Sequence, residues 1–152
     1  MYVVIISGKR IKTVKVKGNS YSRGYEYGEI CKKEIKENIR QCIELCRSYR
    51  KINKETLFDN ADKFIPALKK YDKSLLEEIQ GIANGAGVSL KEIVLLNVKS
   101  ELMNQLWGIN SLHEGCSTFS IKTDNGKRTF LAQTWDWIKD ASERMIILVE
   151  KR

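Results

Sequence analysis

Hydrophobic residues recur at two different spacings along the chain, and the change of spacing separates a helical middle from strand-like ends. Residues 2–7 form an apolar run and residues 10–17 alternate between apolar and polar, so both predict strands, joined at Gly8-Lys9. From Ser22 to about Tyr49, apolar residues recur at helical spacing. This pattern predicts one long helix.

Three more helices are predicted before residue 107. The second covers about 54–71, where Pro66 is expected to kink or break it. The third begins near residue 73 and ends in the glycine-rich run 84–87, which suits a left-handed cap. Ser89 and Glu92 have the spacing of a capping box and predict the start of the fourth helix.

Strand patterns return after residue 115. Residues 116–122 and 128–135 flank a turn at 123–126, which predicts a β-hairpin. Residues 145–150 are almost continuously apolar and predict a buried central strand, although the sequence stops at residue 152. A central strand without an onward partner leaves an open sheet edge, so we expect a fragment, or a protein completed by another chain.

The composition fits one ordered α+β domain. The 152 residues are 42% hydrophobic and 30% charged, with one proline, which is typical of globular rather than disordered chains. No run approaches the ~20 apolar residues that a membrane-spanning helix needs. The apolar start lacks both a basic flank and a small-residue cleavage site, so we expect no secretory signal and a cytoplasmic protein.

The formal charge of +8 is compatible with a nucleic-acid partner, an anionic surface or a solubilising exterior. Acidic residues are interleaved with the lysines, as in 31–37, which favours a solvated helix face. We therefore expect no nucleic-acid partner. A basic helical binding module remains the alternative function from a different class.

The four cysteines, at positions 31, 42, 46 and 116, form no CxxC pair, and His113 is the one histidine of the chain. This pattern indicates neither a zinc site nor a disulfide framework. Cys42 and Cys46 lie on one face of a predicted helix and are interpreted as small buried hydrophobes. Cys116 differs, because it follows Gly115 and opens an alternating strand.

The step from Gly115 to Cys116 has the chemistry of a self-cleavage site. If the Cys116 thiol attacks the Gly115 carbonyl, the peptide rearranges to a thioester, and water releases the upstream segment. Glycine suits this position because it lacks Cβ and admits the nucleophile closely. The cut leaves a new α-amine beside the thiol. Such amines and thiols ordinarily titrate at about 8 and about 8.5, so they can exchange a proton near neutral pH.

This chemistry gives one residue both the nucleophile and the base, without a Cys/His pair. His113 lies three residues before Cys116 and is interpreted as a loop residue. Taken alone, Gly-Cys-Ser-Thr is a weak motif, and it favours a buried structural cysteine on a strand. Further segments around it carry a resemblance to a known family. They are residues 23–29, 77–89, 96–97, 101–102, 114–118, 125–126 and 133–137.

In this combination and order, the sequence resembles the acyl-coenzyme A:6-aminopenicillanic acid acyltransferase (isopenicillin N acyltransferase) family of cysteine N-terminal-nucleophile hydrolases. The resemblance implies a four-layer αββα sandwich, of which this chain would hold a part. Residues 1–115 would be a mainly helical prosegment with N-terminal strands. Residues 116–152 would be the truncated start of the nucleophile-bearing sheet.

The resemblance also implies roles for individual residues. Cleavage would fall between Gly115 and Cys116, with Cys116 as the catalytic nucleophile, and Thr118 and Asp136 would support it. Trp135 and Trp137 would line an acyl pocket, or pack in the core. The family asparagine that stabilises the oxyanion lies in a part absent from this chain, so we expect the segment alone to be inactive on substrate.

Another departure is Thr134, which stands where the family commonly has asparagine. The implied function is a self-processing amide-bond hydrolase or acyltransferase that passes through a thioester intermediate. We favour hydrolysis of a small acylated amide or peptide, with no metal or cofactor; acyl-coenzyme A would be the co-substrate if transfer is the reaction. The implied partner is the remainder of the catalytic domain. A truncated, non-catalytic family remnant is the other alternative.

Overall fold

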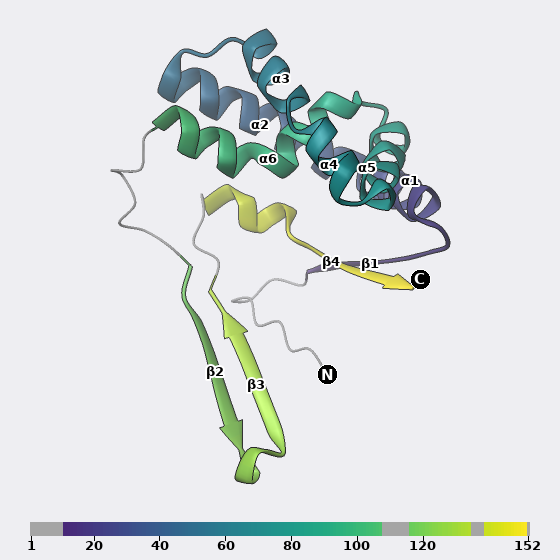
Figure 1. Ribbon diagram of the computed structural model, residues 1–152, viewed down its shortest axis with the longest axis vertical. Coiled ribbons are helices and arrows are strands. Elements are labelled where there is room, and N and C mark those ends of the chain that lie inside the picture. The colour runs from purple at the N-terminus through teal and green to yellow at the C-terminus, as the bar shows by residue number, and fades with distance from the viewer. Residues whose placement is uncertain (1–10, 108–115, 135–138, 152) are drawn as a thin grey trace.

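The computed structural model describes residues 11–107, 116–134 and 139–151, and it confirms the α+β class (Figure 1). The upstream elements are β1 (Lys12–Lys17), α1 (Ser20–Ile30), α2 (Lys32–Arg50), α3 (Lys54–Asp62), α4 (Ile65–Tyr71), α5 (Lys73–Ala86) and α6 (Leu90–Trp107). The downstream elements are β2 (Thr118–Thr123), η2 (Asp124–Gly126), β3 (Arg128–Gln133), η3 (Lys139–Arg144) and β4 (Ile146–Lys151). None of the helices in these ranges combines the length and apolar content that crossing a bilayer requires.

The predicted long helix over 22–49 is wrong, because the structure divides it at Cys31. Helix α1 begins earlier, with the Asn19 side chain accepting a hydrogen bond from the Ser22 amide at 2.8 Å. At Cys31 the backbone leaves the helical region (φ −107°, ψ 18°), and α2 begins at the next residue. The division follows the packing, since α1 lies against α5 while α2 lies against α6.

Helices α1 and α5 cross with their backbones in contact. Gly24 of α1 packs on the backbone of α5, where an added Cβ would lie 2.1 Å from the carbonyl oxygen of Glu78. Gly85 of α5 packs in return on α1, where a Cβ would lie 2.2 Å from the carbonyl oxygen of Tyr25. Gly28 and Gly81 make equally close contacts. Only glycine fits these positions, so the close approach of α1 and α5 depends on these four glycines.

The local signals at the other helix ends are confirmed. The predicted second helix breaks just before Pro66, which lies in the first turn of α4, where a missing amide hydrogen costs nothing. Gly87 caps α5 in the left-handed region (φ 63°). The Ser89 amide donates to Glu92 Oε2 at 2.8 Å and the Glu92 amide donates to Ser89 Oγ at 3.3 Å, which is the expected capping box.

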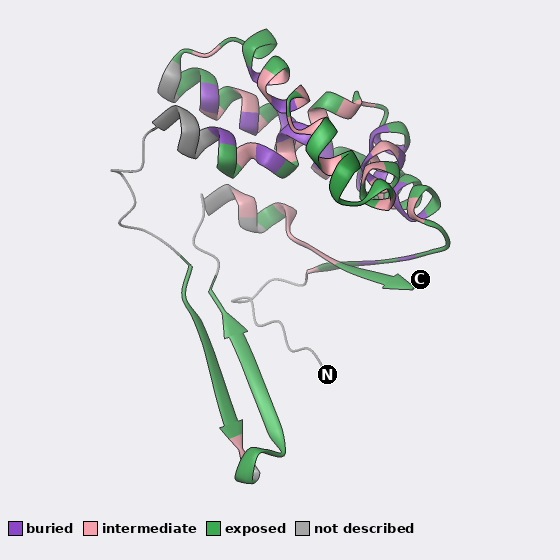
Figure 2. Cartoon of the chain, in the orientation of Figure 1, coloured by how far each residue is buried: buried purple, intermediate pink, exposed green. Residues whose placement is uncertain are grey.

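The hydrophobic core lies among the helices and on one face of β1. Val14 and Val16 of β1 are each 3% exposed and point toward the helices. Cys42 and Cys46 are buried in the same core, which confirms that they act as small hydrophobes, and Cys31 is buried with them. Figure 2 shows that the buried positions concentrate in the helices and β1.

Strand β4 pairs in parallel with β1, in the register Lys12 with Ile146 through Lys17 with Lys151. The prediction of a buried central strand is wrong for the described residues, because β1 is its one strand partner there and Val149 is 44% exposed. The apolar side chains of β4 meet the core at its start, where Ile146 packs against the buried cluster. The predicted strand over 2–7 lies outside the described residues.

Strands β2 and β3 form the predicted antiparallel hairpin, closed by η2, where Asn125 (φ 53°) and Gly126 (φ 87°) supply the turn. The hairpin extends away from the helices (Figure 1), and its strands are exposed almost throughout (Figure 2). Phe119 and Phe130 are more than half exposed, at 58% and 56%.

Candidate active site

Cys116 lies at the open end of the hairpin, two residues before β2. It is exposed, whereas the other three cysteines of the chain are buried. Its thiol is therefore the one that solvent, a substrate or a preceding carbonyl group can reach. This placement fits the predicted role of a nucleophile and does not fit a structural cysteine in the core.

The backbone next to Cys116 is fixed by two hydrogen bonds to one residue. The Ser117 amide donates to Thr134 Oγ1 at 2.9 Å, and the Thr134 amide donates to the Ser117 carbonyl oxygen at 2.8 Å. The pairing continues into the hairpin, where Thr118 lies opposite Gln133. The structure thus brings residues 116–118 together with Gln133 and Thr134, the described part of the segment 133–137 that the sequence singles out.

Sequence reasoning missed the part played by Thr134. Threonine in place of asparagine is a departure from the resemblance, yet the hydroxyl oxygen of Thr134 accepts a hydrogen bond from the backbone next to Cys116. The residue type alone could have indicated this role, because threonine, like asparagine, has a side-chain oxygen that accepts a hydrogen bond.

The remaining predicted site residues are placed only in part. Thr118 is exposed at the first position of β2, two residues after Cys116. Gly115 and Asp136 lie outside the described residues, as do Trp135 and Trp137. Their roles in cleavage, support and acyl binding stay predictions.

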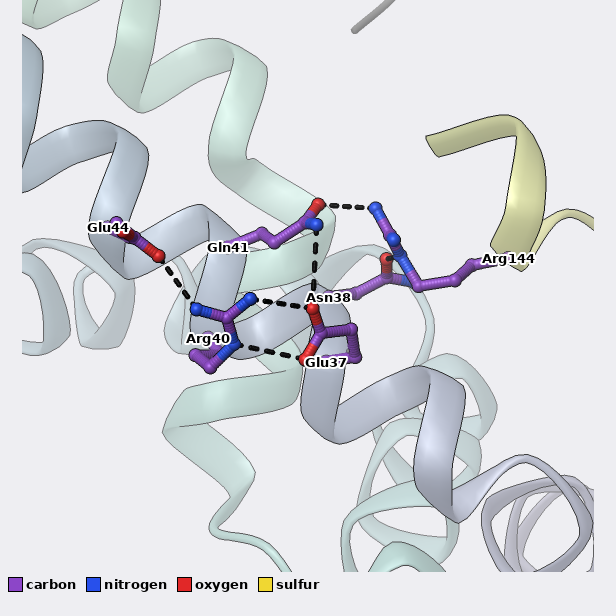
Figure 3. A network of polar contacts seen from close by, with 6 residues as sticks. All are labelled: Glu37, Asn38, Arg40, Gln41, Glu44 and Arg144. Atoms are coloured by element: carbon purple, nitrogen blue, oxygen red, sulfur yellow. Dashed lines mark hydrogen bonds and ion pairs between the residues drawn. The ribbon is translucent and has the colours of Figure 1, made fainter. Parts of the chain in front are cut away.

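Arg144 ties the segment that follows the hairpin to α2. Its Nε donates to Asn38 Oδ1 at 2.7 Å, and its Nη2 donates to Gln41 Oε1 (Figure 3). Arg40, on the same helix, instead bridges Glu37 and Glu44 (Figure 3). Residues 139–144, downstream of Cys116, are therefore held on a helix upstream of it.

Arg23 makes a second link of this kind, from inside the fold. Its side chain is 7% exposed, donates to Glu78 Oε2 at 2.6 Å and to the Gly18 carbonyl oxygen at 2.8 Å, and lies 3.7 Å from Glu150 Oε2. Burial raises the pKa of Glu78; Arg23 partly offsets this rise and the Glu150 carboxylate adds to it. The buried guanidinium of Arg23 therefore interacts with one carboxylate that precedes Cys116 in the sequence, Glu78, and with one that follows it, Glu150.

Comparison with known proteins finds a relative that is an acyltransferase. The chain is 30% identical over 135 residues to the 40 kDa form of acyl-coenzyme A:6-aminopenicillanic-acid-acyltransferase from Emericella nidulans. The chain is distantly related to that protein. The aligned part is 89% of this chain and 36% of that protein, so the chain spans about a third of the relative's length. No family in a scan against protein-family models matches the chain.

Proposed function

We propose that this chain is the helical segment and the nucleophile-bearing first strands of a self-processing acyltransferase or amide-bond hydrolase. The observation that carries the proposal is the exposure of Cys116 at a fixed point of the hairpin, in a chain with 30% identity to an acyltransferase. The fold proposed for the whole protein is the αββα sandwich of N-terminal-nucleophile hydrolases.

Processing would begin with the Cys116 thiol and the preceding peptide bond. The sulfur attacks the carbonyl carbon of Gly115, the carbon–nitrogen bond breaks, and the thiol proton passes to the departing nitrogen. The result is a thioester at Cys116 and a free α-amine on the same residue. Water then hydrolyses the thioester, which leaves a carboxylate on Gly115 and restores the thiol.

The new amine would act as base in the reaction on substrate. It takes the thiol proton, the thiolate attacks the acyl carbonyl of the substrate, and the leaving amine departs with the proton. The acyl group stays on Cys116 as a thioester until water or a second amine removes it. We propose hydrolysis of a small acylated amide or peptide as the net reaction; transfer from acyl-coenzyme A shares the same intermediate.

Two hydrogen bonds support the geometry that this chemistry needs. Because Thr134 binds both the amide and the carbonyl group of Ser117, the backbone on the downstream side of the reacting bond is held in one position. A fixed nucleophile removes part of the entropy cost of reaching the reactive arrangement.

The decisive experiment is intact mass measurement of the full-length protein beside its Cys116→Ala and Cys116→Ser variants. We expect two fragments in the parent, the second beginning at Cys116, and a single uncut chain in Cys116→Ala. Cys116→Ser should be cut more slowly, because a hydroxyl is a weaker nucleophile than a thiol. An uncut parent with full amidase activity would overturn the mechanism.

A further inference from the structure

A cavity of about 420 Å³ lies between α2, the first residue of α3 and the link between α5 and α6. Its volume falls within the range of about 300 to 1,000 Å³ that is typical of small-molecule sites. Ile39, Ile43 and Val88 form an apolar part of its wall. Among the described residues after 115, which are 116–134 and 139–151, none lines the cavity.

The rest of the wall is mainly basic, with Lys36, Arg40 and Lys54. Arg40 adds no free positive charge, since Glu37 and Glu44 hold its guanidinium at 2.7 and 2.8 Å and these two carboxylates outweigh it by one negative charge. Within the described residues, neither Lys36 nor Lys54 forms an ion pair. The Lys54 ammonium group lies over the Phe58 ring, 5.1 Å from its centroid. Two ammonium groups at the wall thus lack a carboxylate among these residues.

One carboxylate, that of Glu92, also reaches the wall. Both the amide and the hydroxyl group of Ser89 donate to its Oε2, at 2.8 and 2.9 Å, so this oxygen is committed to the helix cap. Lys32 adds a further cation nearby, because a Cβ on Gly87 would lie 3.3 Å from its Nζ. The surroundings therefore favour an anion, and the charge on Glu92 favours one negative charge over two.

We propose that this cavity binds a small amphipathic carboxylate. The carboxylate would lie at Lys36 and Lys54, where charge-assisted hydrogen bonds are available. Its hydrocarbon part would cover Ile43 and Val88, which are only partly buried, and so bury apolar surface. This inference is independent of the proposed function, since it uses neither Cys116 nor cleavage.

The test is titration of octanoate into the full-length protein, followed by calorimetry. We expect saturable binding of octanoate, weaker binding of butyrate, and no binding of octanol or inorganic phosphate. Lys36→Gln and Lys54→Gln should each weaken octanoate binding about tenfold, the loss expected for one charge-assisted contact. Lys70→Gln, an exposed lysine of α4 outside the lining, should leave affinity unchanged.

Lys36 is exposed, so Lys36→Gln should melt at the temperature of the parent, whereas Lys54→Gln should melt slightly lower because it loses the contact with Phe58; circular dichroism checks that both variants are folded. Phosphate binding as tight as that of octanoate would show an adventitious ion only and would overturn the proposal. Equal binding of octanol, or no saturable octanoate binding by folded protein, would overturn it as well. So would unchanged affinity in both lysine variants.

Discussion

Nε of Arg23, on α1, lies 3.7 Å from Oε2 of Glu150, on β4. This ion pair joins a helix that precedes the candidate nucleophile to a strand that follows it. Parallel pairing of β1 with β4 and the bonds from Arg144 to α2 make the same connection. Residues 139–151, which follow the proposed cleavage site, therefore pack on β1 and the helices that precede it, although the sequence predicts a boundary at residue 115.

We predict that cutting the chain before Cys116 does not separate its two parts. The test is to place a site for an added protease at residue 115 in the Cys116→Ala background, so that the cut does not depend on self-processing. After digestion, both fragments should elute together in size-exclusion chromatography in native buffer and apart in denaturant. Separation in native buffer would contradict the packing described above.

Arg23→Met should destabilise the fold by about 3 kcal/mol, because it leaves the Glu78 carboxylate partly buried without its cation. Urea unfolding, followed by circular dichroism, measures the change. Arg40→Met is the matched control, since Arg40 also bridges two carboxylates but its side chain is 61% exposed. The loss of stability in Arg40→Met should be far smaller than in Arg23→Met. Equal losses in the two variants would show that burial of Arg23 contributes nothing.

The α1–α5 crossing reverses the usual effect of replacing glycine in a helix. Gly→Ala normally stabilises a helix by up to about 1 kcal/mol. Gly24→Ala should instead destabilise by about 2 to 3 kcal/mol, because the new methyl group meets the Glu78 carbonyl oxygen and forces the helices apart. Ser22→Ala, at an exposed position of α1, is the control and should change stability little. A stabilised Gly24→Ala variant would refute the close crossing.

The four thiols should differ sharply in reactivity. Cys116 is exposed, while Cys31, Cys42 and Cys46 are 0%, 7% and 3% exposed. Brief treatment of the native protein with iodoacetamide should add one carbamidomethyl group, at Cys116, and treatment in denaturant should add four. Peptide mass mapping locates the adducts. Rapid labelling of any buried cysteine in native buffer would contradict the core assignment.

Thr134→Val should slow processing at Gly115–Cys116, because valine keeps the shape of threonine but cannot accept the hydrogen bond from Ser117. Loss of one such bond costs about 0.5 to 1.5 kcal/mol, which corresponds to about a two- to tenfold slower cut. Thr134→Ser keeps the oxygen and should process at nearly the parental rate. The rates are read from the uncut mass over time. Equal rates for valine and serine would remove Thr134 from the proposed site.

The sequence predicted those features whose causes are local. The break before Pro66, the cap at Gly87, the Ser89–Glu92 box and the turn at Asn125 each depend on a few adjacent residues. The break at Cys31 was missed, because neither glycine nor proline occurs there and the cause is packing against two different helices.

The pattern of the sequence also could not predict which elements far apart in the chain contact each other. The apolar run of β4 predicted burial, but pairing with β1 leaves Val149 44% exposed. In the sequence, Arg23 and Gly24 are only part of the segment 23–29 that carries the resemblance. In the structure, helix α5 lies against α1; its Glu78 carboxylate binds Arg23, and its backbone lies close to Gly24. At the candidate site, the sequence predicts Cys116 from its chemistry. The contact of Thr134 with Ser117 depends on strand pairing across the hairpin and is seen only in the structure.

A pH-dependent contact holds β1 to the start of α2. Lys12 Nζ donates to Glu34 Oε1 at 2.7 Å and to the Ile30 carbonyl oxygen at 3.0 Å. The hydrogen bond from Lys12 lowers the pKa of Glu34 below its ordinary value. The ion pair therefore stabilises the fold fully above the pKa that Glu34 has when unfolded, about 4.3, and its contribution is lost as the pH falls through the lowered value.

Lys12→Met should accordingly destabilise the protein by about 0.5 kcal/mol at neutral pH, a small loss because solvent screens a lysine that is 40% exposed. Urea unfolding at a series of pH values should show this difference shrinking below about pH 4, as Glu34 takes up a proton in parent and variant alike. Lys15→Met, at an exposed position of the same strand, should show no such pH dependence. A difference that stays constant down to about pH 3 would mean that Lys12 acts through the Ile30 carbonyl group rather than through Glu34.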